Sequence, residues 1–447
     1  MSIYSFKNLK LKYLITGLIL FLQISTAKEN TFNFNEVWKK IFDNSSLIQA
    51  SSLEVEASNL EKDRASRHWL PKVYLDIKTY KTNDPGMSFF GLLEQKALKN
   101  DDFNSQSINN PSASHFSRGS LGLDLALYEG NFKTTYSSMM TLQSQLKQTE
   151  KKQKTISLYS EVLKAYTQLG IFFLQDIKLA KLSKQIDTLL NSYQLGQKSN
   201  PIGYSGLLGL KSLSLKIKGL NVNNKTQIEA LKVSLYEIGF KEKNWKPNFD
   251  QLLPFLDKLD SLLINNPQSE ASDSFTLQTM NIKKQMSETQ SSLEKSRFLP
   301  RVGIFAETYT FLGDRDSASG YNTGIYLQWN LFRPEDYGVV KESRLKTLTA
   351  EKYYQTLKEQ DQAEIKSKNL MITSLKENLE LLNQSESLIE EQTRVSENLF
   401  KNGSINILQL LELLNRKIDL ITLQMEVSQK LVQLKTENLA KSTTQPQ

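Results

Sequence analysis

The side chains that most often carry catalysis or bind metal ions are scarce in this chain of 447 residues. It has no cysteine and only two histidines, His68 and His115. Without cysteine the chain can form no disulfide, no thiolate metal site and no lipid attachment at an N-terminal cysteine. The histidines fall at the end of a predicted helix and in a predicted loop, and no other ligand stands near them at a metal-site spacing. We therefore predict no catalytic residue, no metal site and no cofactor.

Two other patterns suggest chemistry but lack residues that the chemistry needs. The glycine-containing segment from Gly203 to Gly209 lacks the lysine and the preceding strand of a phosphate-binding loop. The lysine-rich run 150–154 lies in a predicted helix beside Glu150, which is typical of a solvated helix face. Although the net charge is +8, no base-stacking or groove-binding motif accompanies it. An enzyme and a nucleic-acid-binding protein are both disfavoured.

The N-terminus has the pattern of a secretory signal peptide. Lys7, Lys10 and Lys12 precede an apolar run over 14–24, and small residues end at Ala27. We assign residues 1–27 to this peptide and expect the mature chain to be exported. An uncleaved membrane anchor is the alternative, but the run is short for a spanning helix, which needs roughly 20 residues.

Two similar breaks separate predicted helices from predicted strands. Leu70-Pro71 and Leu299-Pro300 each end a helical stretch, because proline disfavours helical geometry in the residue before it. Apolar residues then alternate with polar ones, so the two sets lie on opposite faces of a sheet. This pattern fits a transmembrane β-barrel with a polar interior, or a soluble antiparallel sheet packed on one face. The clearest apolar sets are Val73, Leu75 and Ile77; Leu121, Leu123, Leu125 and Leu127; and Ile325, Leu327, Trp329 and Leu331.

Four predicted strands are too few to close a barrel, and an open sheet edge is not tolerated in lipid. If the strands lie in a membrane, several chains must therefore contribute to one barrel. Oligomerisation follows from the membrane interpretation and also tests it.

Long helices are predicted from about 132 to 193 and from about 339 to 400, where proline is absent. Each would be roughly 90 Å long at 1.5 Å per residue. Apolar residues recur at steps of three and four, as in a coiled coil. A cytosolic coiled-coil rod would explain these helices but neither the signal peptide nor the strands. The predicted seams are Ile156, Tyr159, Leu163, Tyr166, Gly170, Phe173 and Ile177, then Ile407, Leu411, Leu414, Ile418, Ile421 and Met425.

The pattern occurs twice, with Pro71 and Pro300 lying 300 − 71 = 229 residues apart. We predict an internal twofold repeat of helix–strand–strand–helix–helix blocks. The first block spans 28–240 and the second 273–441. Between them, the proline-containing segment 241–272 is predicted to be a linker with small helices, and 442–447 a disordered tail.

This order of elements resembles that of the TolC-type outer-membrane efflux proteins over nearly all of the mature chain. Besides the two Leu-Pro breaks, a loop string and two strand ends carry the resemblance. The loop string comprises Gly91-Leu92-Leu93-Glu94-Gln95, Asp102-Phe103-Asn104 and Asn109-Asn110-Pro111, and the strand ends are Leu127-Tyr128-Glu129-Gly130 and Leu331-Phe332-Arg333-Pro334.

The resemblance implies a mainly α fold with a small transmembrane β part. A homotrimer with four strands from each chain would make a composite 12-stranded β-barrel in the outer membrane. A long α-helical coiled-coil barrel would continue it into the periplasm. The implied partners are outer-membrane lipid, a periplasmic adaptor (membrane fusion) protein and an inner-membrane pump of the RND, ABC or MFS type.

The resemblance also implies site residues at the tips of two helical hairpins. The family commonly carries two acidic residues that ring the periplasmic entrance; the matching positions here are Gln409 and Glu412, so only Glu412 keeps the acid. Phe400 replaces a tyrosine, and Ile405 replaces a basic residue. We expect Phe400, Gln409 and Glu412 to form a periplasmic gate. The expected adaptor contacts are Leu195, Gly196, Gln197, Asn402, Gly403 and Ser404, although these turns are also what a glycine helix cap would produce.

Two function classes follow. The first is an exit duct of a tripartite efflux or type I secretion system, in which a passive conduit is gated at its helical tip. The second is a soluble periplasmic coiled-coil structural or adaptor protein. An exported enzyme would need a polar cleft that the sequence does not predict. Drug efflux, metal efflux and protein secretion would use the same architecture, so the sequence does not identify the substrate.

Overall fold

The computed structural model describes residues 30–193, 201–248 and 274–441. The predicted signal peptide, the tip residues Leu195, Gly196 and Gln197, most of the predicted linker and the tail lie outside the described residues. The chain divides into two compact units, each with segments from both halves of the sequence. The helical unit comprises Met1–Ala50, Lys152–Phe275 and Gln360–Gln447, and the sheet unit comprises Ser51–Lys151 and Thr276–Glu359.

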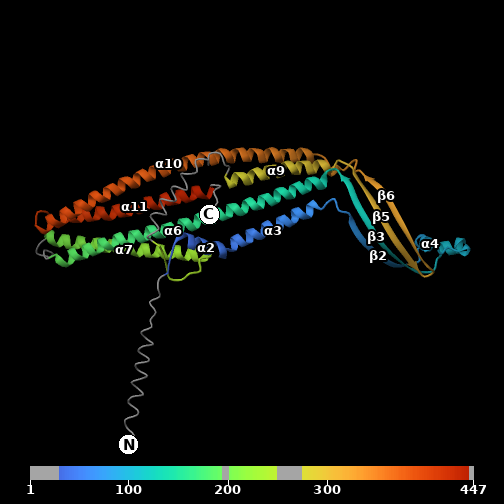
Figure 1. Cartoon of the computed structure of the whole chain (residues 1–447), viewed down its shortest axis with the longest axis horizontal. Coiled ribbons are helices and arrows are strands. Elements are labelled where there is room, and N and C mark those ends of the chain that lie inside the picture. The colour runs from blue at the N-terminus through green and yellow to red at the C-terminus, as the bar shows by residue number, and fades with distance from the viewer. Residues whose placement is uncertain (1–29, 194–200, 249–273, 442–447) are drawn as a thin grey trace, which may run out of the picture. The chain divides into compact units, whose positions relative to one another are not determined.

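The order helix–strand–strand–helix–helix occurs twice, and the prediction of a mainly α fold with a small β part is confirmed (Figure 1). Both Leu-Pro breaks lie between a helix and a strand, as predicted. The first series is α3 (Ser46–Ser66), β2 (Lys72–Thr82), β3 (Ser114–Glu129), α6 (Phe132–Ser192) and α7 (Pro201–Glu237). The second is α9 (Phe275–Ser296), β5 (Arg301–Gly313), β6 (Ser317–Gln328), α10 (Val339–Lys401) and α11 (Ile407–Lys441). A short 3₁₀ turn, η4 (Pro334–Asp336), precedes α10.

The helical stretch predicted before the first Leu-Pro break does not include the first described residues. Residues Asn30–Phe32 form β1, which pairs in parallel with β4 (Trp245–Pro247) from the predicted linker. Asn33 then caps α2 (Phe34–Asn44), with its side chain and that of Glu36 bonding each other's backbone N–H. Ser45, in extended conformation, separates α2 from α3.

The sheet unit contains one antiparallel sheet of order β2-β3-β5-β6 (Figure 1). Cross-strand partners such as Leu75 and Leu121, and Ile304 and Ile325, place the predicted apolar residues on one face. This apolar face is open, with Ile325 77% exposed and Leu75 68% exposed. Among the described strands, β2 and β6 each have a partner on one side only.

The predicted alternation extends too far at two strand ends. A register shift between Ala126 and Tyr128 takes Leu127 out of the pairing, because the bulged strand has one residue more than its partner. The strand β6 ends at Gln328, so Trp329 and Leu331 follow the strand rather than belong to it.

The opposite, polar face has aromatic rings lying over glycines. Tyr74 is the cross-strand partner of Gly122, and a Cβ on that glycine would lie 2.2 Å from the tyrosine ring. The same relationship joins Tyr326 to Gly303, at 2.4 Å. The other two such pairs are Phe305 with Gly324 and Tyr309 with Gly320. Only glycine leaves room for a ring at these positions.

Two apolar clusters lie in the helical unit. One joins α2 to α6 and α7 through Val37, Ile41 and Tyr166. The other joins α6, α7 and α11 through residues such as Ile186, Ile217 and Leu414. The predicted seams are largely confirmed, but Ile177 is 62% exposed. Along α6 the buried positions beyond Phe172 are Gln175, Leu179, Leu182, Ile186 and Leu189. No helix in the described ranges combines the length and apolarity needed to cross a bilayer.

Candidate functional site

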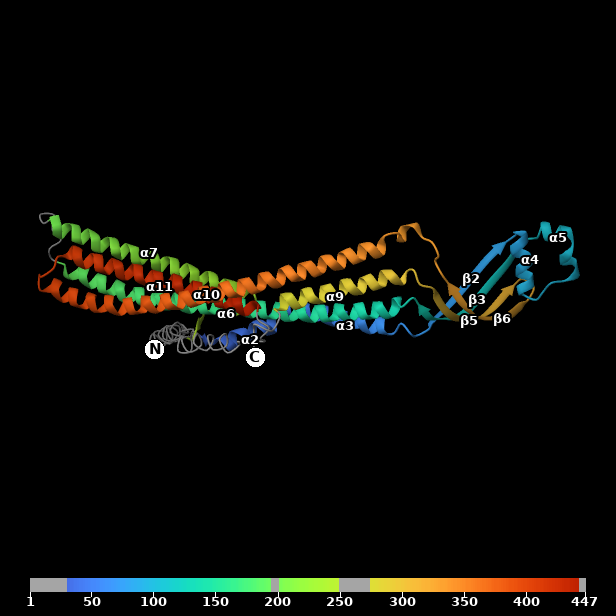
Figure 2. The ribbon, with the colours of Figure 1, turned by 90° about the horizontal axis from the view of Figure 1, so that it is seen from above.

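Four helix ends come together at one end of the helical unit (Figures 1 and 2). They are the C-terminal ends of α6 and α10 and the N-terminal ends of α7 and α11. We call this group the helix-end cluster. It contains the predicted gate residues Phe400, Gln409 and Glu412 and the predicted contact turn over 402–404.

Phe400 packs the end of α10 against the end of α6 within this cluster. Its ring stacks on that of Tyr193, with ring centroids 6.2 Å apart and planes inclined by 26°. Both rings pack against the second apolar cluster. Burial raises the pKa of the Tyr193 hydroxyl above its usual value. The phenylalanine found where the resembled family has tyrosine therefore acts through packing.

The predicted contact turn Asn402, Gly403 and Ser404 closes α10 as a Schellman motif. Gly403 has φ +73°, which favours glycine. Its N–H donates to the Phe400 carbonyl at 3.0 Å, and the Ser404 N–H donates to the Leu399 carbonyl at 2.8 Å. All three turn residues are exposed. The turn is thus a helix cap that leaves its surface accessible.

Gln409 forms a capping box at the start of α11. Its side-chain oxygen accepts from the Asn406 N–H at 3.1 Å, and its own N–H donates to Asn406 Oδ1 at 3.1 Å. These reciprocal bonds satisfy two backbone donors that a helix N-terminus leaves free. Gln409 therefore stabilises the N-terminal end of α11, in addition to any role at a gate.

Glu412 is paired along its own helix. Arg416 Nη2 lies 2.6 Å from Glu412 Oε1, one helical turn away, and both side chains are about two-thirds exposed, at 63% and 66%. The acid predicted to form a ring thus has a cation beside it. The electrostatic field around Glu412 therefore comes from a pair of opposite charges and not from an isolated carboxylate.

The glycine-containing segment of α7, not predicted to act at this site, sets the approach of α7 to α11. A Cβ on Gly206 would lie 2.1 Å from Ile407, and one on Gly209 would lie 2.4 Å from Leu411. Further along, Lys216 bonds Asn415 at 2.8 Å and Asp419 at 2.7 Å. The spacing of three between the glycines places them on one helix face and could have indicated such a contact.

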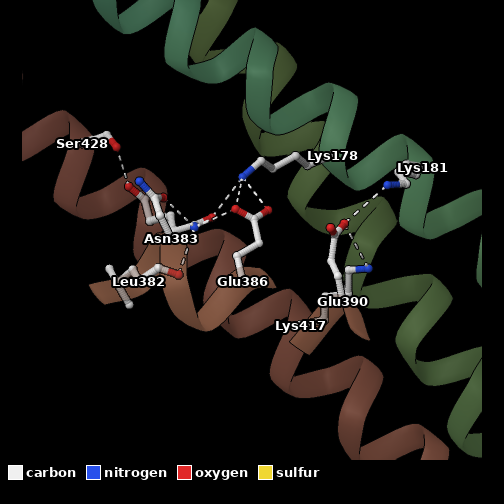
Figure 3. A network of polar contacts seen from close by, with 9 residues as sticks. Lys178, Lys181, Leu382, Asn383, Glu386, Glu390, Lys417 and Ser428 are labelled. Atoms are coloured by element: carbon white, nitrogen blue, oxygen red, sulfur yellow. Dashed lines mark hydrogen bonds and ion pairs between the residues drawn. The ribbon is translucent and has the colours of Figure 1, made fainter. Parts of the chain in front are cut away.

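A polar network joins α6, α10 and α11 farther along the helical unit (Figure 3). Lys178 donates to both Glu386 oxygens, at 2.6 and 2.8 Å, and to Gln424 at 3.1 Å. Gln424 in turn donates to Glu386 at 2.9 Å and to Asn383 at 3.1 Å. Burial acts to raise the pKa of Glu386, but the bonds from Lys178 and Gln424 outweigh it and lower that pKa.

Two more charge clusters tie α10 to its neighbours. Glu390 lies 3.4 Å from Lys181 of α6 and 3.9 Å from Lys417 of α11 (Figure 3). Glu364 bonds Lys368 at 2.8 Å and also bonds Lys441 of α11. Hydrogen bonds from Lys368 and Lys441 lower the pKa of Glu364 to about 2. These networks hold α10 to α6 and α11.

The histidines have local partners. His68 Nδ1 lies 3.1 Å from the Ala65 carbonyl at the end of α3. His115 belongs to β3 and pairs with Lys81, so the expectation of a loop is wrong there, and its N–H donates to Asp314 at 2.9 Å. Within the described residues, no group of three or more histidines, aspartates or glutamates could hold a metal ion.

The chain is similar to solved structures of bacterial outer-membrane proteins. It aligns with the outer membrane protein VceC of Vibrio cholerae at 9% identity and a TM-score of 0.72, covering 92% of this chain and 97% of that one. The Campylobacter jejuni CmeC outer membrane channel gives 11% identity and a TM-score of 0.72, with 94% and 90% covered. The open state of the Neisseria gonorrhoeae MtrE outer membrane channel gives 11% identity and a TM-score of 0.70, with 92% and 91% covered.

No family model and no curated protein matches the sequence. At identities near one-tenth, the likeness concerns the fold and not the individual side chains. It extends over almost the whole length of both chains. The expected architecture is confirmed at that level: this chain has the fold of the TolC-type outer-membrane channels.

Proposed function

We propose that this protein is the outer-membrane exit duct of a tripartite efflux or type I secretion system. Three copies would form one 12-stranded barrel in the outer membrane, continued into the periplasm by a helical barrel. The duct would be passive. Energy would come from an inner-membrane pump, coupled through a periplasmic adaptor.

The observation that carries this proposal is the four-stranded sheet. One face carries apolar side chains from all four strands, many of them exposed in the single chain, and the other face is polar and aromatic. A sheet in lipid needs an apolar outer face and no open edge. Pairing β6 of one copy with β2 of the next would meet both requirements. The fold shared with outer-membrane channels supports the same assembly.

The helix-end cluster supports a gate and a contact surface. Its closure would depend on the Phe400–Tyr193 stack, which joins the end of α10 to the end of α6. Opening would separate the end of α10 from the end of α6 and break this stack. The exposed turn at 402–404 and the predicted turn at 195–197 would present backbone and small side chains to the adaptor.

Membrane fractionation followed by sizing of the detergent-extracted protein tests the assembly. We expect a trimer in the outer-membrane fraction. A monomer or dimer that remains soluble without detergent would overturn the barrel and favour a periplasmic coiled-coil structural or adaptor protein. Conductance of the purified trimer in planar bilayers then tests the duct directly.

A further inference from the structure

The connection between β2 and β3, residues 83–113, carries three short helices. They are α4 (Pro85–Glu94), η1 (Asn100–Phe103) and α5 (Ser105–Asn109). They lie at the end of the sheet where the β5–β6 turn also lies (Figures 1 and 2). We call residues 83–113 the lid segment and this end the turn end of the sheet.

The lid segment packs on the polar face of the sheet. A Cβ on Gly91 of α4 would lie 2.5 Å from the ring of Phe116, so the helix rests directly on that ring. Phe116 is only 1% exposed and Phe311 only 3%, and their ring centroids lie 5.8 Å apart. Tyr80 pairs with Phe116 across the strands and belongs to the same face as Tyr74, Arg118 and Tyr309. The segment thus covers the face opposite the apolar one.

Gln95 ties the end of α4 to the β5–β6 turn. This side chain is 1% exposed, and its oxygen accepts from the backbone N–H groups of Arg315 at 3.3 Å and Asp316 at 3.1 Å. Its amide N–H donates to the Gly91 carbonyl at 3.1 Å. A buried amide with partners on both elements fixes their separation.

An ion pair provides a second tie. The Arg315 guanidinium donates two parallel bonds to the Asp102 carboxylate, at 2.7 and 2.9 Å. Asp102 is 7% exposed. Bidentate arginine–carboxylate pairs are stronger and more directional than ordinary side-chain bonds. The hydrogen bond from Arg315 lowers the pKa of Asp102, so the pair stays charged near neutral pH.

Two partly open hollows border the lid segment beside these ties. A cavity of about 380 Å³ lies between α4 and the sheet, lined by Tyr80, Met87, Phe90 and Phe311 among others. Another of about 310 Å³ lies beside the ion pair, lined by polar residues of α5 and by Arg315. An element that is held by a few specific ties and bordered by such hollows can separate locally without unfolding the sheet.

We propose that the lid segment closes the outer mouth of the duct and that the Asp102–Arg315 pair, with Gln95, is its latch. This inference rests on the proposed function, because the polar face lines the duct only if the barrel forms. In three copies, three lid segments would occupy the space in front of the turn end of the polar faces. Release of the latch would let each swing away about its two ends, where it joins β2 and β3.

The test compares single-channel conductance with hydrogen exchange of the lid segment in the trimer. We expect Arg315→Gln and Asp102→Asn each to raise both exchange over 85–109 and conductance, the latter by about two-fold. The reversed pair Asp102→Arg with Arg315→Asp should restore both values toward those of the unchanged protein. Lys133→Gln, which removes the Lys133–Glu129 pair at 3.0 Å on another part of the sheet unit, is the matched control and should change neither.

Because the chain has no cysteine, a bridge can be placed without removing native thiols. The variant Asp102→Cys with Arg315→Cys, joined by a short bis-methanethiosulfonate linker, should conduct less until a reductant is added. Faster exchange with unchanged conductance would overturn the lid, and unchanged exchange would overturn the latch. A trimer that never conducts, with or without the latch, would instead overturn the proposed duct.

Discussion

The ring of Phe400, at the end of α10, stacks on the ring of Tyr193, at the end of α6. This contact joins elements from the two halves of the sequence within the helix-end cluster. An aromatic pair contributes about 0.5–1.5 kcal/mol beyond its buried area. We predict that Phe400→Ala loosens this end and raises the open-to-closed ratio about five-fold, since 1.4 kcal/mol corresponds to about ten-fold.

Single-channel recording of the trimer checks this prediction, with Phe400→Tyr as the control that keeps the stack. Equal open probabilities for Phe400→Ala and the unchanged protein would show that the stack does not hold the closed end.

The pairing of Glu412 with Arg416 leads to a prediction about ion selectivity at the predicted periplasmic gate. A ring of acids favours cations, but here each acid has a cation at 2.6 Å. We predict that Glu412→Gln lowers cation selectivity and that Arg416→Gln raises it. Reversal potentials in a salt gradient measure both. If the two variants shift the reversal potential in the same direction, or not at all, these residues do not face the conducting path.

The Lys178–Glu386 pair should couple α6 to α10 weakly but measurably. Their side chains are 42% and 24% exposed, so solvent screens much of the attraction. We predict a coupling free energy of about 1 kcal/mol from a double-mutant cycle with Lys178→Met and Glu386→Gln. The Glu342–Lys346 pair, with side chains 63% and 69% exposed, is the control and should give a value near zero. Equal couplings for the two pairs would contradict a special role for the network.

Glu364 should make stability depend on pH in a defined direction. Its folded pKa of about 2 is below its usual value of 4.5, because Lys368 and Lys441 favour the charged form. The stabilisation is therefore fully present above about pH 4.5 and is lost as pH falls toward 2. We predict that Glu364→Gln lowers the melting temperature at pH 7 and that the difference shrinks below pH 4.5. A difference that grows on acidification would contradict this assignment.

Much of the fold could be predicted because its signals are local. A proline stops each helix before a strand, alternation assigns two faces to the strands, and an uninterrupted run produces the long helices α6 and α10. The helix cap at Gly403 could be predicted in the same way, since glycine after a helical run is a strong signal for a C-terminal cap. The capping box at the start of α11 could also be predicted, because Asn406 and Gln409 are three residues apart.

Other features depend on partners far apart in sequence. The exposure of Ile177 could not be predicted from steps of three and four, because the neighbours of α6 change along its length. The contact of Gly206 with Ile407 joins residues about two hundred positions apart, and no local pattern specifies the partner. The latch is another such case. Asp102 lies in η1, between β2 and β3, and Arg315 lies between β5 and β6, so their pairing depends on the sheet register.

The glycines of the polar face affect how much space lies in front of that face in the proposed duct. At Gly122, Gly303, Gly320 and Gly324 the opposing aromatic side chain occupies the space that a Cβ would fill, 2.2 to 2.9 Å from its nearest atom. Alanine at any of the four would displace that side chain from the backbone. In the proposed barrel, the absence of four methyl groups would therefore widen the space in front of the polar faces.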